Sequence, residues 1–192
     1  QISTDFVFDG VQGSPYKTHQ TRKPINFYGK SKADGEVSVE KLLKVSEQGT
    51  VIRTSWLFGP VGNNFILKML EMLKKKKEIN IVSDQIGSPT STFSLAHACW
   101  KTIELKTKKS QEIPHLMHWS DAGAASWYDL AIAVGEIAQK LSILSNPAII
   151  NPISSGEYTT LAKRPSYSIL DCFSTRSLLG INPLHWKLSL DK

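Results

Sequence analysis

The sequence has no long apolar run and very little cysteine. None of its apolar stretches approaches the roughly 18 residues that a membrane-spanning helix needs, so we expect no membrane partner. The two cysteines, Cys99 and Cys172, stand far apart and form no metal-ligand spacing, which favours reduced, structural thiols in a cytoplasmic protein. With 41% hydrophobic and 21% charged residues over 192 positions, the composition is that of a globular protein of one or two domains.

The sequence also lacks a concentrated basic surface, although its net charge is +6. Its one dense basic run, Lys74 to Lys77, follows an apolar helical pattern and would complement the C-terminal end of the helix dipole. Because no basic stripe with interleaved aromatic residues occurs, we expect no nucleic-acid partner.

Strand and helix patterns alternate along the first 60 residues. Residues 2–8 and 50–58 are apolar and β-branched, which predicts two buried strands. Between them lies a helical pattern with Val37, Leu42 and Val45 on its apolar face. The order strand, helix, strand predicts an α/β fold with a parallel sheet and a right-handed crossover. Because the first strand follows directly on the first residue, we expect the sequence to begin inside a domain.

Further elements follow to the end of the sequence. We predict helices at 65–73, 95–103, 126–141 and 174–179, and strands at 79–82, 116–119 and 148–150. Asn63 and Asn64 form an N-cap pair before the first of these helices, with Asn63 expected to be the cap. Ser126 with Asp129 forms a capping box for the third. The helix at 95–103 carries Trp100 and Ile103 in an apolar stripe.

Tyr28 and Lys32 stand four residues apart at the start of the first helix. This spacing places both side chains on one face, where the ammonium favours the phenolate and so helps the phenol to exchange a proton. A carbonyl reductase needs such a pair, but the same spacing also arises on solvated helix faces. Ser3, Thr4 and Asp5 in the preceding strand strengthen the hypothesis, because ligands contact the carboxyl ends of strands in open α/β sheets. The alternative is that these three residues start a turn.

Together, several ordered motifs resemble the dTDP-4-dehydrorhamnose reductase family, of the extended short-chain dehydrogenase/reductase superfamily. The resemblance covers nearly the whole sequence, and its motifs are residues 3–10, 24–32, 53–59, 84–90, 118–123 and 163–171. It implies the C-terminal part of a Rossmann-type, doubly wound parallel sheet with a smaller α/β substrate-binding domain. Residues 1–60 would complete the nucleotide-binding domain, and residues 61–192 would mainly bind substrate, partly interleaved with it.

The resemblance also implies a reaction, in which NADPH or NADH reduces the C4 ketone of dTDP-4-dehydro-L-rhamnose to give dTDP-L-rhamnose. Tyr28 would donate the proton, Lys32 would hold the nicotinamide ribose, and Thr4 would orient the carbonyl. Ser3 would join Tyr28 and Lys32 in binding the cofactor. The substrate would be bound by Thr4 together with Asp5, Phe6, Trp56, Asn64, Gln85 and Arg164.

The glycine-rich G-x-x-G-x-x-G turn of the superfamily has no counterpart in the sequence. We therefore expect a fragment that holds the catalytic pair without the pyrophosphate cradle and is inactive by itself. A homodimer and a structural Mg²⁺ are both compatible with the resemblance, and no residue pattern argues for either.

Two alternatives share much of this pattern. A nucleotide-sugar epimerase or dehydratase has the same Thr, Tyr and Lys but keeps its NAD bound through the cycle. A non-catalytic regulatory subunit keeps the reductase fold, as the β subunit of methionine adenosyltransferase does. The motifs at 84–90 and 163–171 favour the reductase over an epimerase. Tyr28 and Lys32 are both present, so the sequence shows no loss of the catalytic pair that would indicate a regulatory subunit.

Overall fold

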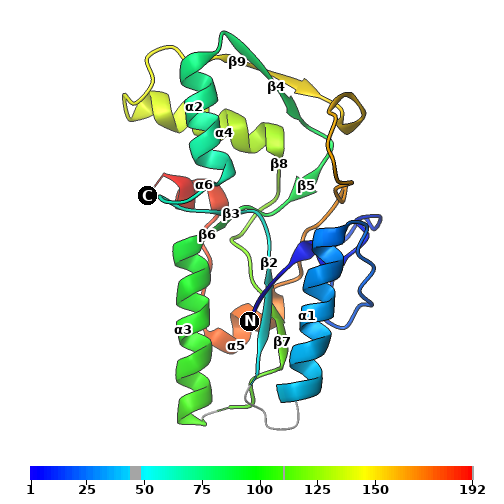
Figure 1. Cartoon of the computed structure of the whole chain (residues 1–192). Helices are drawn as coiled ribbons and strands as arrows, with labels where there is room; N and C mark the ends of the chain where they lie inside the picture. Colours follow the sequence, from blue (N-terminus) through cyan, green and yellow to red (C-terminus); the bar gives the residue numbers. More distant parts are fainter. Residues whose placement is uncertain (44–48, 110, 192) are drawn as a thin grey trace.

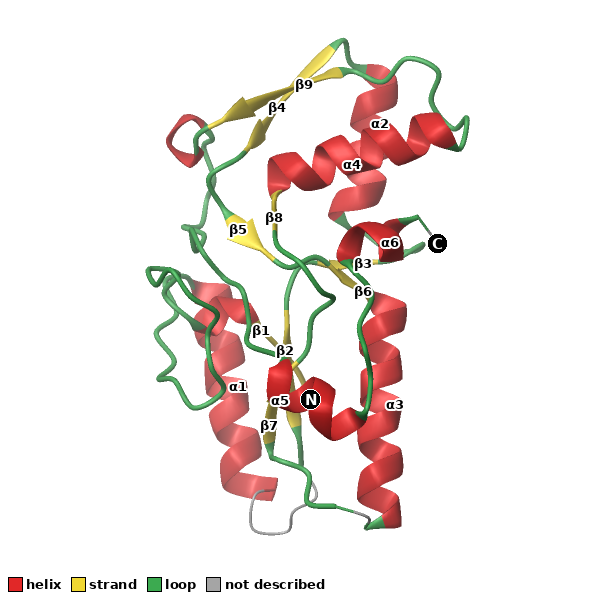
Figure 2. Ribbon diagram, turned by 180° about the vertical axis from the view of Figure 1, so that it is seen from behind, coloured by secondary structure: helices red, strands yellow, loops and turns green. Residues whose placement is uncertain are grey.

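The computed structural model of the chain describes residues 1–43, 49–109 and 111–191. Its centre is a three-stranded parallel sheet with the strand order β1 (Ile2–Thr4), β2 (Val51–Thr54) and β7 (Leu116–His118). Helix α1 (Phe27–Leu43) connects β1 to β2, and α3 (Thr92–Lys108) precedes β7. These helices flank the sheet on opposite sides (Figures 1 and 2). The predicted parallel strand-helix-strand unit and the α/β fold class are confirmed.

The first strand is shorter than predicted. β1 ends at Thr4, and Asp5–Val7 forms a 3-10 helix, η1. The Thr4 hydroxyl oxygen accepts a hydrogen bond from the Phe6 amide at 3.2 Å, a local bond that competes with further strand pairing. The prediction of a strand through Phe8 is therefore wrong, and the polar residues begin a turn at the carboxyl end of the sheet.

The second predicted strand is interrupted at Trp56. β2 ends at Thr54, and the chain resumes as β3 (Leu57–Phe58), which pairs in parallel with β6 (Thr90–Ser91). Trp56 has a φ of 47°, a left-handed conformation that is strained for a large side chain. The turn at this residue directs the chain away from the central sheet.

A second group of elements packs beyond the end of the central sheet, in the upper part of Figure 1. It contains α2 (Phe65–Lys75), α4 (Trp127–Lys140) and the parallel pair β4 (Glu78–Val82) and β9 (Ile149–Ile153). Their apolar faces form one core, which includes Met69, Leu73, Ile79, Leu130 and Val134. Among the described residues, no helix combines the length and apolar character of a membrane span.

Short elements connect the two groups and complete the chain. β5 (Ile86–Gly87) pairs antiparallel with β8 (Ala125–Ser126), and the remaining elements are η2 (Ser155–Glu157), α5 (Phe173–Leu179) and α6 (Trp186–Leu190). The helices and strands predicted after residue 60 are all present, with ends that shift by a few residues.

Two predictions about local packing and capping are wrong. Asn64, not Asn63, caps α2, because its Oδ1 accepts the Leu67 amide at 3.2 Å. Trp100 and Leu42 are 70% and 77% exposed, so neither lies on the buried face of its helix. The capping box of Ser126 and Asp129 is confirmed. Val45 lies outside the described residues.

The chain passes several times between the two groups. After β2 it enters the outer group through α2 and β4, and it returns with α3 and β7 to the central sheet. It leaves again through α4 and β9 and returns with α5, which packs on α3. Three elements beyond residue 60, namely β7, α3 and α5, therefore belong structurally to the central sheet. The assignment of residues 61–192 mainly to substrate binding stays a prediction.

A buried ionic network fixes α1 to the sheet. The Glu36 carboxylate, 0% exposed, accepts hydrogen bonds from Ser3 on β1, from Arg53 on β2 at 2.7 and 2.8 Å, and from Arg22 in the preceding loop at 2.5 Å. Burial by itself would raise the pKa of Glu36, but the hydrogen bonds and charge of Arg53 hold it below its usual value. Glu36 therefore stays ionised and joins three segments.

Arg53 extends this network to the third strand. Its Nη1 donates to Nε2 of His118 on β7 at 3.3 Å, and its guanidinium lies 4.9 Å from the centre of the Phe8 ring. Burial, followed by the charge of Arg53, lowers the pKa of His118 to about 3, so the imidazole is neutral and can accept this bond.

Replacing Glu36 tests how strongly the network supports the fold. In Glu36→Ala, the Arg53 guanidinium, 1% exposed, loses its counterion, so we expect the free energy of unfolding to fall by about 3 to 5 kcal/mol in urea titrations. Glu40→Ala is the control, because Glu40 is partly exposed and Arg22 is its one ion-pair partner in the described structure. Its loss should cost less than about 1 kcal/mol. Equal effects of the two variants would contradict this role for Glu36.

Candidate functional site

The first turn of α1 approaches η1 very closely. A Cβ atom at Gly29 would lie 2.1 Å from the Phe6 carbonyl oxygen, so only glycine permits this contact. The approach brings the neighbouring Tyr28 against Phe6, with their ring centres 5.9 Å apart and the rings nearly perpendicular. Tyr28 is 53% exposed. Its phenol is thus held beside the carboxyl end of β1 but stays open to a ligand.

Lys32 lies one turn after Tyr28 and contacts the first strand. Its Nζ donates to the Ile2 carbonyl oxygen at 2.7 Å. An ammonium has three N–H groups, and in the described part of the chain Ile2 supplies the acceptor for one of them. Ser3, predicted to bind the cofactor, is 3% exposed and donates its hydroxyl to Glu36 instead. Between Ser3 and Lys32, it is Lys32 whose side chain has hydrogen-bond donors left for a ligand.

Thr4 and Asp5 form a buried polar pair at the end of β1. They are 5% and 2% exposed, and Thr4 Oγ1 donates to Asp5 Oδ1 at 3.0 Å. Asp5 Oδ2 has no hydrogen-bond partner among the described residues. Burial raises the pKa of Asp5 to about 6, although the nearby hydroxyls of Ser168 and Thr4 oppose this shift. Ser168 does not complete a hydrogen bond to Oδ2.

Trp56 stacks on Trp127, at the start of α4, with the ring centres 3.6 Å apart and the planes at 5°. The left-handed turn at Trp56 directs its indole over Gly87, where a Cβ would lie 2.4 Å from the ring. The Arg164 guanidinium lies 5.9 Å from the Trp127 ring centre, which allows a cation–π contact. The result is an aromatic stack with a cation on its outer side.

A cavity of about 260 Å³ adjoins this stack. Gln85, Arg164 and Trp127 line it together with Phe65 of α2 and Tyr158, which follows η2. A planar aromatic wall, a guanidinium and an amide are suited to a nucleotide, because the ring stacks on a base or sugar and the guanidinium pairs with phosphate. Two of the predicted substrate residues, Gln85 and Arg164, therefore line one pocket.

One loop connects this pocket with the Tyr28 region. The Lys163 carbonyl oxygen accepts a hydrogen bond from Asn26 Nδ2 at 2.9 Å, two residues before Tyr28. Further along the same loop, the Ser168 amide donates to the Ile86 carbonyl at 2.8 Å, in β5. The catalytic candidates and the pocket thus belong to one continuous arrangement.

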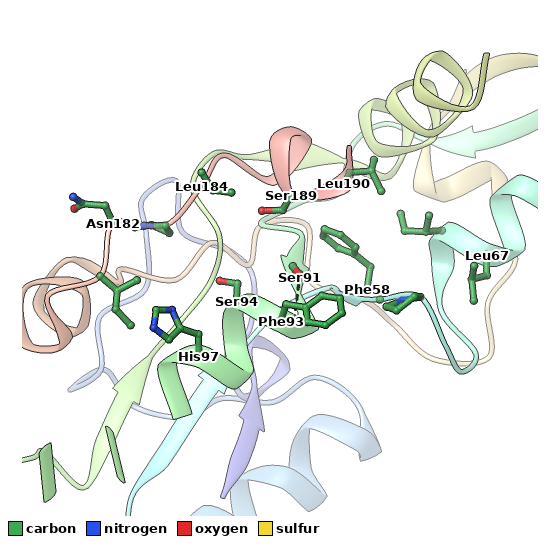
Figure 3. A pocket seen from close by; sticks show the side chains of 15 residues that line it. Phe58, Leu67, Ser91, Phe93, Ser94, His97, Asn182, Leu184, Ser189 and Leu190 are labelled. Carbon is green, nitrogen blue, oxygen red and sulfur yellow. Dashed lines mark hydrogen bonds between the residues drawn. The ribbon is translucent and has the colours of Figure 1, made fainter. Parts of the chain in front are cut away.

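Asn64 and a cavity beside α3 lie outside this arrangement. Asn64 uses its side chain to cap α2 and to donate to the Gly59 carbonyl at 2.9 Å. A cavity of about 490 Å³ is lined by residues of β3, α3 and the C-terminal segment, including Phe58, His97 and Leu184 (Figure 3). None of the predicted site residues lines it.

The comparisons with known proteins agree with this geometry. The family model described as the RmlD substrate binding domain matches residues 1–192. The chain belongs to the RmlD substrate-binding domain family. The dTDP-4-dehydrorhamnose reductase of Aggregatibacter actinomycetemcomitans is 38% identical over 190 residues, which cover 98% of this chain and 63% of that protein. The family predicted from the motifs is therefore confirmed.

Solved structures give the same result for this member of the RmlD family. The dTDP-4-dehydrorhamnose reductase of Clostridium acetobutylicum has a TM-score of 0.84 and 33% identity, covering 100% of this chain and 62% of that one. The Bacillus anthracis enzyme, solved in complex with NADP, has a TM-score of 0.81 and 32% identity, covering 99% and 62%. The chain thus spans less than two thirds of the length of these relatives.

Sequence reasoning missed Trp127 as a residue that lines the pocket. Its position directly after the N-cap Ser126 indicates only the first turn of a helix. No spacing pattern links it to Trp56, because the two rings meet through tertiary packing. In the described residues, no group of three His, Cys, Asp or Glu side chains could hold a metal ion, so no site for Mg²⁺ is evident there.

The two glycines of α1 provide a test of the close approach to η1. Gly29→Ala should lower the free energy of unfolding by about 1 to 3 kcal/mol, because its Cβ would collide with the Phe6 carbonyl. Gly35→Ala is the matched control, since its Cβ would meet only the flexible end of Gln1 at 3.1 Å. It should raise the stability by up to about 1 kcal/mol through helix propensity. In urea unfolding, the two substitutions should change the free energy of unfolding in opposite directions. A Gly29→Ala variant as stable as wild type would contradict the steric argument.

Proposed function

We propose that the polypeptide that carries this chain reduces the C4 ketone of dTDP-4-dehydro-L-rhamnose with NADPH or NADH. The observation that carries the proposal is that Tyr28 contacts Phe6 and Lys32 contacts Ile2, two residues after and two residues before Thr4. The same region is joined through Asn26 to the loop that reaches a pocket lined by Arg164 and Trp127. The names of the relatives support the same activity, and the Bacillus anthracis relative is solved with NADP. Because the chain spans about 63% of a relative, the activity is proposed for a polypeptide that includes the remaining segment.

The residues around Tyr28 fit a nicotinamide cofactor. Lys32 is bound to the Ile2 carbonyl by one of its three N–H groups and has donors left for ribose hydroxyls. Tyr28 is exposed on the same helix face. The backbone at Ser3 borders this region, whereas its side chain is committed to Glu36. A bound reduced nicotinamide would supply the hydride.

Each catalytic candidate then has a distinct task. Thr4 donates a hydrogen bond that orients the C4 carbonyl, and Tyr28 gives its proton to the C4 oxygen as negative charge develops there. Lys32 holds the nicotinamide ribose with the N–H groups that Ile2 leaves free. Phe6 holds the Tyr28 ring in place through its edge contact. Asp5 borders the sugar end of the site.

The nucleotide end of the substrate is assigned to the pocket beside α4. Arg164 is suited to bidentate contact with the diphosphate, and Gln85 offers both a donor and an acceptor. The stacked rings of Trp56 and Trp127 form a flat apolar wall beside them. Asn64 has less capacity for substrate, because its side chain already forms three hydrogen bonds at the start of α2. A cytoplasmic location and a homodimer stay predictions.

Cofactor consumption tests the proposed function against its alternatives. The complete polypeptide, mixed with dTDP-4-dehydro-L-rhamnose and NADPH or NADH, should lose the absorbance of the reduced nicotinamide in a one-to-one ratio with the ketone. Net reduction needs one outside hydride for each product, whereas an epimerase returns the hydride that it takes.

Two results would contradict a reductase. Protein that keeps NAD bound through gel filtration and consumes no added cofactor would favour an epimerase. Protein that neither binds cofactor nor converts the sugar would favour a regulatory subunit. The 192 residues by themselves should consume no cofactor, because they contain no glycine-rich turn to hold the pyrophosphate.

Substitutions in α1 test the assigned roles in the complete polypeptide. Tyr28→Phe removes only the proton donor, so kcat should fall by about 10² to 10⁴ with little change in substrate affinity. Lys32→Ala should also weaken cofactor binding. Tyr128→Phe and Lys30→Ala are matched controls, because Tyr128 packs against the outer core and Lys30 pairs with Asp34 in solvent. Wild-type turnover by Tyr28→Phe, with chemistry rate-limiting, would reject Tyr28 as the acid.

A further inference from the structure

The single proton of the Thr4 hydroxyl is already in use. Thr4 Oγ1 donates to Asp5 Oδ1 at 3.0 Å and accepts from the Phe6 amide at 3.2 Å. A hydroxyl has one proton to donate, and a ketone oxygen can only accept. While Asp5 is a carboxylate that accepts this proton, Thr4 has none for a substrate carbonyl. The role assigned to Thr4 therefore depends on the state of Asp5.

The surroundings of Asp5 favour the carboxylic acid. The residue is 2% exposed, and its Oδ2 has no hydrogen-bond partner within the described ranges. A buried carboxylate with an unsatisfied oxygen is costly, and protonation lowers that cost because it removes the charge. The shift in the pKa of Asp5 to about 6, caused mainly by burial, agrees with this geometry.

The charged groups of the neighbouring elements are bound elsewhere. On α1, Lys32 donates to the Ile2 carbonyl, and Glu36 is paired with Arg53 of β2. Tyr28, on α1, contacts Phe6 through its ring, and Tyr167 stands next to Ser168 in the opposite loop. His118 of β7 is neutral and accepts from Arg53. In the described structure, no cation pairs with Asp5 to hold it as a carboxylate.

We propose that Asp5 is a positioning residue that must carry a proton during the reduction. Protonated Asp5 donates to Thr4 Oγ1, and the Thr4 hydroxyl is then free to donate to the ketone oxygen. The contact of 3.0 Å between the two side chains serves both states, because only the direction of the hydrogen bond changes. This inference rests on the proposed reduction, and it concerns the proton on Asp5 rather than the identity of the acid, Tyr28.

The first experiment measures the proton directly, without turnover. The carboxyl carbon of Asp5, assigned by comparison with Asp5→Asn, is followed by NMR in the complete polypeptide as the pH is varied. We expect a midpoint near 6 that rises when the keto sugar binds without cofactor, because the ketone competes for the Thr4 proton. A midpoint at or below 3.8, the ordinary value, would overturn the proposal whether or not the protein reduces the sugar.

Stability gives a second readout with a definite sign. A raised pKa means that the folded protein binds the Asp5 proton more tightly than the unfolded chain does. The stability due to this proton is complete below about pH 4 and is lost as the pH rises through about 6. The urea midpoint of Asp5→Asn should therefore match wild type near pH 4 and exceed it above about pH 6. If the urea midpoints of Asp5→Asn and wild type differed by the same amount at both pH values, the result would contradict the proposal.

The pH dependence of kcat/KM tests the positioning role. The side-chain amide that Asp5→Asn introduces would be a permanent donor to Thr4. The variant should lose the decline in kcat/KM that wild type shows as Asp5 ionises. The advantage of the variant, its kcat/KM divided by that of wild type, should grow by about tenfold for each pH unit above the midpoint of the Asp5 titration. Adding Thr4→Val to Asp5→Asn should abolish the advantage, because the relay acts through the Thr4 hydroxyl.

The outcomes separate this inference from the proposed function. A loss of activity of about 100-fold or more in Asp5→Asn at every pH would mean that the carboxylate itself is needed, and it would overturn the proposal. A wild-type kcat/KM that stays constant as the pH passes through the measured Asp5 midpoint would also overturn it. Absence of ketone reduction at every pH, with Asp5 titrating near 6, would instead contradict the proposed function.

Discussion

The position of α1 depends on the buried carboxylate of Glu36. This residue lies eight positions after Tyr28 and four after Lys32, on the helix face that meets the sheet. Its bonds to Ser3 and Arg53 join the helix to two strands, and Arg53 carries the connection to the third. Because an ionic network of this kind needs all its partners, a rotation of α1 would leave buried charges unpaired. The direction of the Tyr28 and Lys32 side chains is thereby set by contacts one and two turns away.

Glu36 and Asp5 show how two buried carboxyl groups near one helix acquire different properties. Glu36 has two guanidinium partners and stays ionised despite its burial. Asp5 has hydroxyl and amide neighbours and one oxygen without a partner among the described residues, so burial dominates. Environments that separate the proton affinities of two like groups are typical of active sites, because one group can then hold structure while the other takes part in proton exchange.

Regular patterns in the sequence were sufficient to predict the framework and the shared helix face of Tyr28 and Lys32. Alternating strand and helix signals predicted the parallel sheet, and the four-residue spacing predicted that Tyr28 and Lys32 share a face. The ends of the strands were harder to predict, because local interactions override the strand pattern. The Thr4 side chain ends β1, and the strained turn at Trp56 ends β2. The stack of Trp56 on Trp127 was not predictable, because it joins segments about 70 residues apart that meet only through tertiary packing.

The repeated passage of the chain between the central sheet and the outer group has a mechanical consequence. A single hinge can move two parts only when one connection joins them, whereas here α2, α3, α4 and α5 are all reached through separate crossings. Bending would require coordinated changes at each of these connections. Truncation at residue 60 would likewise remove β7, α3 and α5 from the sheet that they complete. The Tyr28 region and the pocket beside Trp127 are therefore held at a nearly constant separation.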